Sequence, residues 1–162
     1  MNSQSVFSEG VRAGVVGAAA VAIWFFVIDI ITGRPLHTPD VLGDALVSVL
    51  RANERFGTMG HVIVYTIFHV VAFIIIGVVA AAILRISDRE PGVLAGAAVL
   101  FVVFEVGFLF FTYLLTKSSS LGDLAWYQIG LANILSSALM GRMLFRAHPG
   151  VVHRADQALR GI

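Results

Sequence analysis

The sequence predicts an all-α integral membrane protein built as a bundle of four transmembrane helices. Of its 162 residues, 58% are hydrophobic and only 13% are charged, and the mean hydropathy is +0.90. A soluble domain usually carries about 25% charged residues. Four segments of roughly 20 mostly apolar residues, the length that crosses a bilayer as a helix, make up most of the chain. These uninterrupted runs lack the apolar and polar alternation of a membrane β-barrel.

The first span is expected over about residues 11–33. From Ala13 to Gly33 its only charged residue is Asp29. The apolar run exceeds the roughly 7–15 residues of a signal-peptide core, and no small-residue cleavage pattern follows it, so we expect the span to be retained. Gly33 is a residue that can end the helix.

The external loop, residues 34–60, is predicted to contain an amphipathic helix over about residues 39–55. Thr38 is a typical N-cap residue, and Pro39 suits the first helical position. The apolar residues that follow recur at helical spacing. This pattern predicts a helix that lies on the outer membrane surface or caps the bundle.

The remaining spans are expected over about residues 61–85, 91–116 and 124–146. The second carries no formal charge before its last residue, and the third contains only Glu105 as a charged residue. The fourth is the least hydrophobic, so we expect it to face neighbouring helices more than lipid.

Glycines at the start of two spans predict close contacts between helices. Gly10 and Gly14 open the first span, and Gly92 and Gly96 open the third. This spacing allows helix backbones to approach closely. The matching segments also suggest two helical hairpins related as a parallel repeat.

Four spans place both termini on the same side of the membrane. The positive-inside rule then predicts cytoplasmic termini, because 7 of the 11 Lys and Arg residues fall on that side. We therefore expect a multi-pass protein of the cell (inner) membrane, with residues 10–147 as the membrane domain and residues 1–9 and 148–162 in the cytoplasm. The 7 basic residues are Arg12, Arg85, Arg89, Arg142, Arg146, Arg154 and Arg160.

Polar side chains at membrane depth are costly to insert and mark candidate sites. Helix rise places one hydrogen-bonding side chain from each span at a common depth, about 12–16 Å from the external face. This predicted deep polar layer consists of Trp24, His69, Glu105 and Asn133. His69 and Glu105 lie on spans joined by a short loop, so we expect them to meet and to share a hydrogen bond or a proton.

A predicted outer polar layer lies nearer the external face and consists of Asp29, His61, Tyr65 and Tyr113. His61, Tyr65 and His69 follow i, i+4, i+8 spacing and therefore form one stripe on their helix. The two layers together predict a hydrogen-bonded path through the outer half of the membrane.

Several kinds of chemistry are excluded or disfavoured. The chain has no Cys, which removes disulfides and thiolate sites, and its net charge of +1 gives no basic surface for nucleic acid. The two His residues of the second span share one helix, which does not suit axial ligation of haem, and one deep Glu is too few for a di-iron bundle. No metal-ligand spacing is present. We therefore expect no catalytic residues, metal or cofactor.

The first functional expectation is a non-enzymatic accessory or scaffolding subunit that packs against itself or other membrane proteins. Its basis is that the sequence encodes spans, caps and packing faces, and that the soluble segments are too short for a catalytic domain. One alternative is a proton-linked small transporter or channel that uses Glu105 and His69. A second is a quinone- or lipid-handling membrane enzyme with Asp29, His61 and Tyr65 at its mouth. The polar residues also have a structural interpretation as contacts between helices, worth about 0.6 kcal/mol each.

Overall fold

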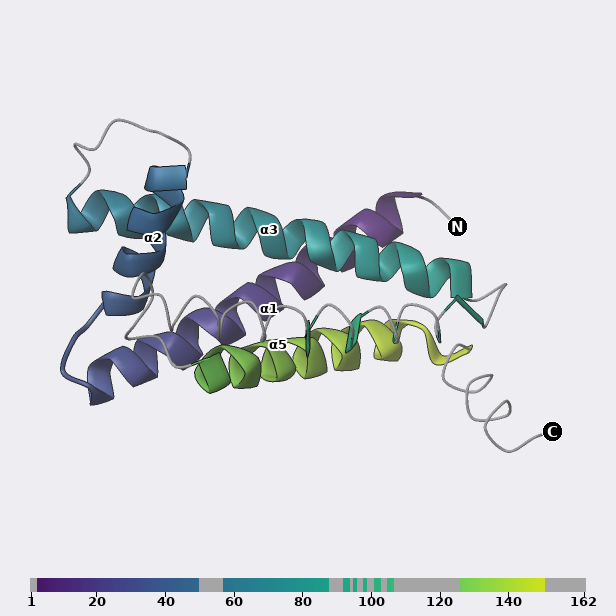
Figure 1. Cartoon of the computed structure of the whole chain (residues 1–162). Coiled ribbons are helices and arrows are strands. Elements are labelled where there is room, and N and C mark those ends of the chain that lie inside the picture. The colour runs from purple at the N-terminus through teal and green to yellow at the C-terminus, as the bar shows by residue number, and fades with distance from the viewer. Residues whose placement is uncertain are drawn as a thin grey trace.

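All regular secondary structure in the described part of the chain is α-helical. The computed structural model describes residues 3–49, 57–87, 92–93, 95, 98, 101–102, 105–106 and 126–150. These residues contain four helices and no strand (Figure 1), which confirms the all-α prediction for this part of the chain. The helices are α1 (Ser3–Ile31), α2 (His37–Val49), α3 (Thr58–Ser87) and α5 (Trp126–Ala147).

Two helices have the length and composition of membrane spans. They are Val6–Ile31 within α1 and Thr58–Ser87, which is α3, and they are the only such helices among the described residues. The helix α5, where the fourth span was expected, is more polar than these two helices and is not one of the candidate spans. Most of the third expected span, over residues 91–116, lies outside the described residues, although the positions described between 92 and 106 are helical.

The helix α1 is the centre of the fold, because α3 packs along one of its sides and α5 along another (Figure 1). One buried cluster joins all three helices through Ala13, Ala81, Leu84 and Leu144. A second joins α1 to α5 through Val21, Phe25 and Ala132. The core of the described residues therefore contains two small clusters at different levels along α1.

Glycines form the crossing point of α1 and α3. A Cβ added at Gly77 of α3 would lie 2.6 Å from the backbone nitrogen of Gly14 and would also overlap the Gly10 carbonyl. A Cβ added at Gly14 would lie 2.7 Å from the Cα of Ile74. The close backbone approach predicted for Gly10 and Gly14 is thus confirmed.

The helices α1 and α3 diverge from this crossing towards the C-terminal end of α1, and α2 lies across the open end (Figure 1). The helix α2 packs on α3, with Gly43 directly against the backbone of His61. The expected loop helix is therefore present and packs against α3 and α1. The part of its expected range over residues 50–55 lies outside the described residues.

A glycine ends α1 as predicted. Gly33 has a φ of 71°, its N–H donates to the Ile30 carbonyl at 3.0 Å, and the Arg34 N–H donates to the Asp29 carbonyl at 2.8 Å. These two bonds form a Schellman motif, in which the last carbonyls of a helix are satisfied and the chain turns away from the helix axis. The turn directs the chain back towards α3.

The predicted N-cap of α2 is wrong. The helix begins at His37 instead of residue 39, and the first helical bond runs from the Asp40 N–H to the Leu36 carbonyl at 3.1 Å. Thr38 therefore lies inside the first turn. Leu36 precedes the helix with a φ of 66°, a conformation that non-glycine residues rarely adopt.

The outer faces of α1 and α3 are apolar and exposed. Most of the apolar stretch of α3 is not buried inside the protein, whereas the core helix of a soluble protein is mostly buried. Exposed apolar areas larger than a few hundred Å² mark contacts with a membrane or with protein. The exposed residues of α3 include Ile63, Ile67, Phe68, Val71, Ile75, Ile76 and Val79.

We predict that Gly77→Ala destabilises the fold by about 1–3 kcal/mol, because the new methyl group would overlap the backbone of α1 and force the two helices apart. The matched control is Gly141→Ala on α5, where an added Cβ would lie 3.8 Å from the Phe145 ring. The control is expected to be neutral or slightly stabilising, since Ala is the better helix former. Unfolding in mixed detergent micelles measures both variants, and equal stabilities would contradict the proposed crossing.

Candidate functional site

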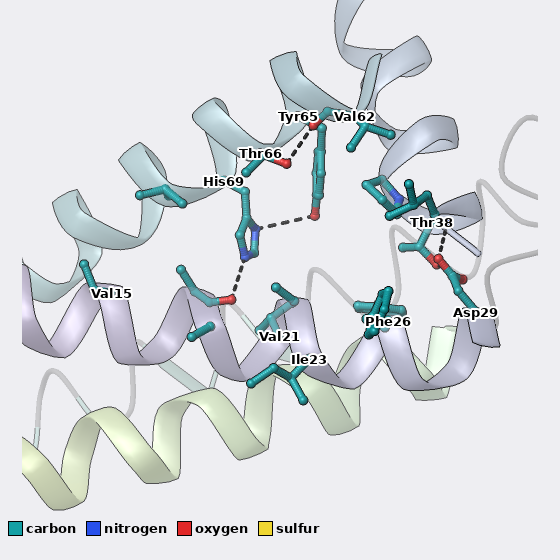
Figure 2. Close-up of a pocket in the computed structure, with 17 residues that line it drawn as sticks. Val15, Val21, Ile23, Phe26, Asp29, Thr38, Val62, Tyr65, Thr66 and His69 are labelled. Atoms are coloured by element: carbon teal, nitrogen blue, oxygen red, sulfur yellow. Dashed lines mark hydrogen bonds between the residues drawn. The ribbon is translucent and has the colours of Figure 1, made fainter. Parts of the chain in front are cut away.

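A cavity of about 440 Å³ lies where α1 and α3 diverge, with the start of α2 at one end. This volume is within the roughly 300–1,000 Å³ typical of small-molecule sites. Its walls are almost entirely apolar and include the aromatic rings of Phe25 and Phe26. Polar side chains enter it from both ends: Asp29 with Thr38, and Tyr65 with His69 (Figure 2). An apolar pocket with a few convergent polar groups is the usual form of a binding site.

Asp29 forms one polar end of the cavity and caps α2 from the last turns of α1. Its carboxylate accepts a hydrogen bond from the Thr38 N–H at 2.8 Å and another from the Thr38 hydroxyl at 2.7 Å. The side chain is only 2% exposed. The N-terminus of a helix carries a partial positive charge and unpaired N–H groups, so it is a favourable place for a buried carboxylate.

The first turn of α2 explains why the capping group has to come from another helix. The His37 N–H donates to the Arg34 carbonyl at 3.1 Å, and Pro39 has no N–H to satisfy. Thr38 lies between His37 and Pro39, and its N–H donates a hydrogen bond to the Asp29 carboxylate. The geometry of this turn therefore gives the buried Asp29 a structural role as the capping group of α2.

The second polar end of the cavity is formed by Tyr65 and His69, which both point from α3 towards α1 (Figure 2). His69 Nε2 lies 3.2 Å from the carbonyl oxygen of Ala18, and His69 Nδ1 lies 3.5 Å from the Tyr65 hydroxyl. The stripe expected on this helix is therefore present on the face that packs against α1. It continues one turn further to Phe73, whose ring centroid lies 4.7 Å from that of His69.

His61, at the start of the same stripe, contacts α2 and not the cavity. Its Nδ1 lies 3.0 Å from a carboxylate oxygen of Asp40, and its Nε2 lies 3.8 Å from one of Asp44. The Thr58 hydroxyl donates to the other oxygen of Asp40 at 3.3 Å. These contacts hold α2 on α3, as the Asp29 pair holds it on α1.

The sequence did not point to Asp40 and Asp44 as partners of His61. They follow i, i+4 spacing, so they lie on one face of α2, but only the folded loop brings that face to α3. Their spacing was the available signal, and it is also common on solvent-exposed helix faces.

The four residues of the predicted deep polar layer do not form one hydrogen-bonded group but take part in separate contacts. The Trp24 indole donates to the Gln128 carbonyl at 3.1 Å, and the Asn133 amide donates to Glu105 Oε2 at 3.4 Å. Glu105 Oε1 is buried without a hydrogen-bond partner among the described residues. Trp24, Glu105 and Asn133 do not line the cavity.

The hydrogen bond expected between His69 and Glu105 is not among those that the structure shows for these two residues. Each makes its hydrogen bonds elsewhere: His69 with Ala18 and Tyr65, and Glu105 with Asn133. The physical reason is the direction of each side chain around its helix. His69 faces α1, whereas Glu105 faces α5. Tyr113, the last member of the predicted outer layer, lies outside the described residues.

Within the part of the chain that the structure describes, no three His, Asp or Glu side chains converge in a way that could hold a metal ion. His61 illustrates the reason, since Asp40 and Asp44 contact different nitrogens of its ring.

Comparisons with known proteins gave no relative: no protein-family model, no curated protein and no solved structure matches this chain.

We predict that Asp29→Ala lowers the free energy of unfolding by about 1–3 kcal/mol, because it leaves the buried Thr38 N–H and hydroxyl without their acceptor. Asp29→Asn is expected to lose less, since its amide oxygen can still accept from the Thr38 N–H. Amide hydrogen exchange in the first turn of α2 and thermal unfolding in detergent measure both effects.

The control for this prediction is Asp44→Ala, which removes a carboxylate from α2 whose side chain is 69% exposed. It is expected to change stability by less than about 1 kcal/mol. If Asp29→Ala and Asp44→Ala behave alike, Asp29 is not the cap of α2.

Proposed function

We propose that this protein is a four-span integral protein of the cell membrane that holds a lipophilic molecule between α1 and α3 and does not transform it chemically. The observation that carries the proposal is the apolar cavity at the divergence of these helices. Its lining includes side chains that are also exposed on the outer surface of the helices, among them Ile23, Phe26 and Thr66. In a bilayer such a cavity would open sideways towards the lipid chains.

Membrane insertion is supported by the two long apolar helices and their exposed faces. The proposed orientation keeps both termini in the cytoplasm and puts α2 on the external side. The cavity then lies in the outer half of the membrane, below α2. The expected third and fourth spans complete the bundle in this proposal.

A role as an accessory or scaffolding subunit is compatible with lipophile binding, because an apolar molecule seated between two helices would fix their spacing. The lipid-handling alternative from the sequence keeps Asp29 and Tyr65 in the cavity lining, whereas His61 holds α2. The proton-linked alternative is less well supported, because His69 and Glu105 hydrogen-bond to different residues.

We predict that single-cysteine labelling will show four membrane spans with both termini in the cytoplasm. The chain has no natural Cys that would need removal first. Gly57→Cys and Ser119→Cys, in the two expected external segments, should react with a membrane-impermeant maleimide in intact cells. Ala147→Cys, at the end of α5, should react only after the cells are opened. Protection of Ser119→Cys in intact cells would show that the third and fourth segments do not cross, and would refute the four-span proposal.

We predict that Ala22→Trp fills the cavity and lowers saturable binding of an apolar probe. Ala22 lines the cavity and is itself exposed, so the large side chain can be introduced without disturbing the core. The probe is a photoactivatable ten-carbon hydrocarbon added to protein in lipid nanodiscs. Labelling of the cavity should saturate with probe concentration, whereas labelling of the outer face at Ile75 and Val79 should rise linearly.

The matched control is Ala138→Trp, at an exposed alanine of α5 outside the cavity. It should leave the saturable component at the wild-type level, whereas Ala22→Trp should reduce it several-fold. Labelling of the cavity that rises linearly in the wild-type protein would refute lipophile binding.

A further inference from the structure

The hydrogen bonds of His69 leave one nitrogen of its ring available as an acceptor. A carbonyl oxygen can only accept, so the contact with Ala18 at 3.2 Å puts the proton of the neutral ring on Nε2. Nδ1 then carries a lone pair, and it faces the Tyr65 hydroxyl on the cavity side (Figure 2). The donor that would best satisfy Nδ1 is therefore an O–H or N–H group.

Tyr65 satisfies that lone pair poorly. Its hydroxyl lies 3.5 Å from His69 Nδ1, longer than the roughly 2.5–3.2 Å of ordinary hydrogen bonds. The other bonds at the cavity are shorter, such as 2.8 Å between the Thr38 N–H and Asp29. The Tyr65 and His69 rings also stack, with ring centroids 5.4 Å apart and planes 29° from parallel.

We propose that Tyr65 and His69 bind the hydroxyl group of a lipophilic alcohol whose apolar body fills the cavity. The ligand hydroxyl accepts a hydrogen bond from the Tyr65 O–H and donates one to His69 Nδ1. A single hydroxyl supplies both functions, and the 3.5 Å gap between the two protein atoms is short enough for one oxygen to reach both. The inference rests on the proposed function, because it names the chemistry of the ligand that the cavity would hold.

Other head groups fit this pair less well. An ether or a carbonyl can accept from Tyr65 but cannot donate to His69, and an ammonium group can donate to His69 but cannot accept from Tyr65. A carboxylate accepts only, and it would enter a cavity that already contains the buried carboxylate of Asp29. Like charges at such a site disfavour each other. The pair therefore selects for a neutral group that both donates and accepts.

The apolar walls select the rest of the ligand. Asp29 and Thr38 satisfy each other at the far end, and the Thr66 hydroxyl donates to the Val62 carbonyl of its own helix at 2.7 Å. The remaining lining is dominated by aliphatic and aromatic side chains. A long-chain alcohol with one hydroxyl and no other polar group matches this distribution.

The experiment compares decan-1-ol with decyl methyl ether, which has the same chain but cannot donate. Equilibrium binding of each radiolabelled compound is measured with protein in lipid nanodiscs, after subtraction of protein-free discs and at matched concentrations in the lipid. We expect the alcohol to bind about tenfold more tightly than the ether, the usual effect of leaving one buried polar group unpaired.

The variant that tests the assignment is Tyr65→Phe, which keeps the ring and its stacking and removes only the hydroxyl. Because the alcohol and the ether both accept from the Tyr65 O–H, this variant should lower both affinities and keep their ratio near tenfold. His69→Phe, which removes the Nδ1 acceptor that only the alcohol can satisfy, should bring the alcohol-to-ether ratio close to one. The control is Thr66→Val, which removes a neighbouring hydroxyl of the cavity wall whose proton is already donated to its own helix. This control should keep both wild-type affinities as well as their ratio.

The outcomes separate this inference from the function on which it rests. If both compounds bind the wild-type protein saturably with equal affinity, the hydroxyl assignment is overturned and the lipophile site stands. If neither binds saturably, the site itself is refuted. A tenfold ratio that persists in His69→Phe, or an alcohol affinity that Tyr65→Phe leaves unchanged, also overturns the assignment, because the binding would then depend on another group.

Discussion

The contact between Gly77 and the backbone of α1 at Gly10 and Gly14 is the constraint on which the rest of the arrangement depends. Two straight helices that touch at one level through their backbones must separate at other levels if their axes are inclined. The separation occurs towards the C-terminal end of α1, and it leaves the space that the cavity occupies. Larger residues at the crossing would hold the helices apart along their whole length and replace this wedge-shaped gap with ordinary side-chain packing.

The open end of the wedge requires a cover, and the polar residues of α1, α2 and α3 provide its attachment. Asp29 of α1 hydrogen-bonds to the first turn of α2. His61 of α3 contacts the acidic face of α2 through Asp40. Each contact satisfies groups that would otherwise be buried or half-buried without partners. The two helices are thus joined at one end directly, through glycine, and at the other end through α2.

The sequence predicted the helices well because the signals for them are local. Apolar runs of fixed length, the glycine pair in α1 and the C-terminal cap at Gly33 depend on residues close together in the chain. The start of α2 was predicted wrongly because its capping group, Asp29, comes from another helix and Leu36 adopts an unusual backbone conformation. Propensity at Thr38 could not reveal either feature.

Candidate site residues were harder to predict for a related reason. Counting helix rise gives the depth of a residue, but not the direction in which its side chain points around the helix. His69 and Glu105 were placed at one depth, and they face different neighbours. The stripe of Tyr65 and His69 was predictable, since residues four apart share a face, but which helix that face meets depends on the glycine crossing.

The position of α2 also decides from which side a ligand would reach the cavity. In the proposed orientation, Leu36, Thr38 and Pro39 close the cavity on the aqueous side, and the buried Asp29 pair lies among them. The lateral side is lined by Ile23 and Phe26, which are exposed on the face that lipid would cover. A molecule entering from water would have to displace α2 and break its cap. A molecule dissolved in the bilayer would not, so the geometry favours ligands that partition into lipid before they bind.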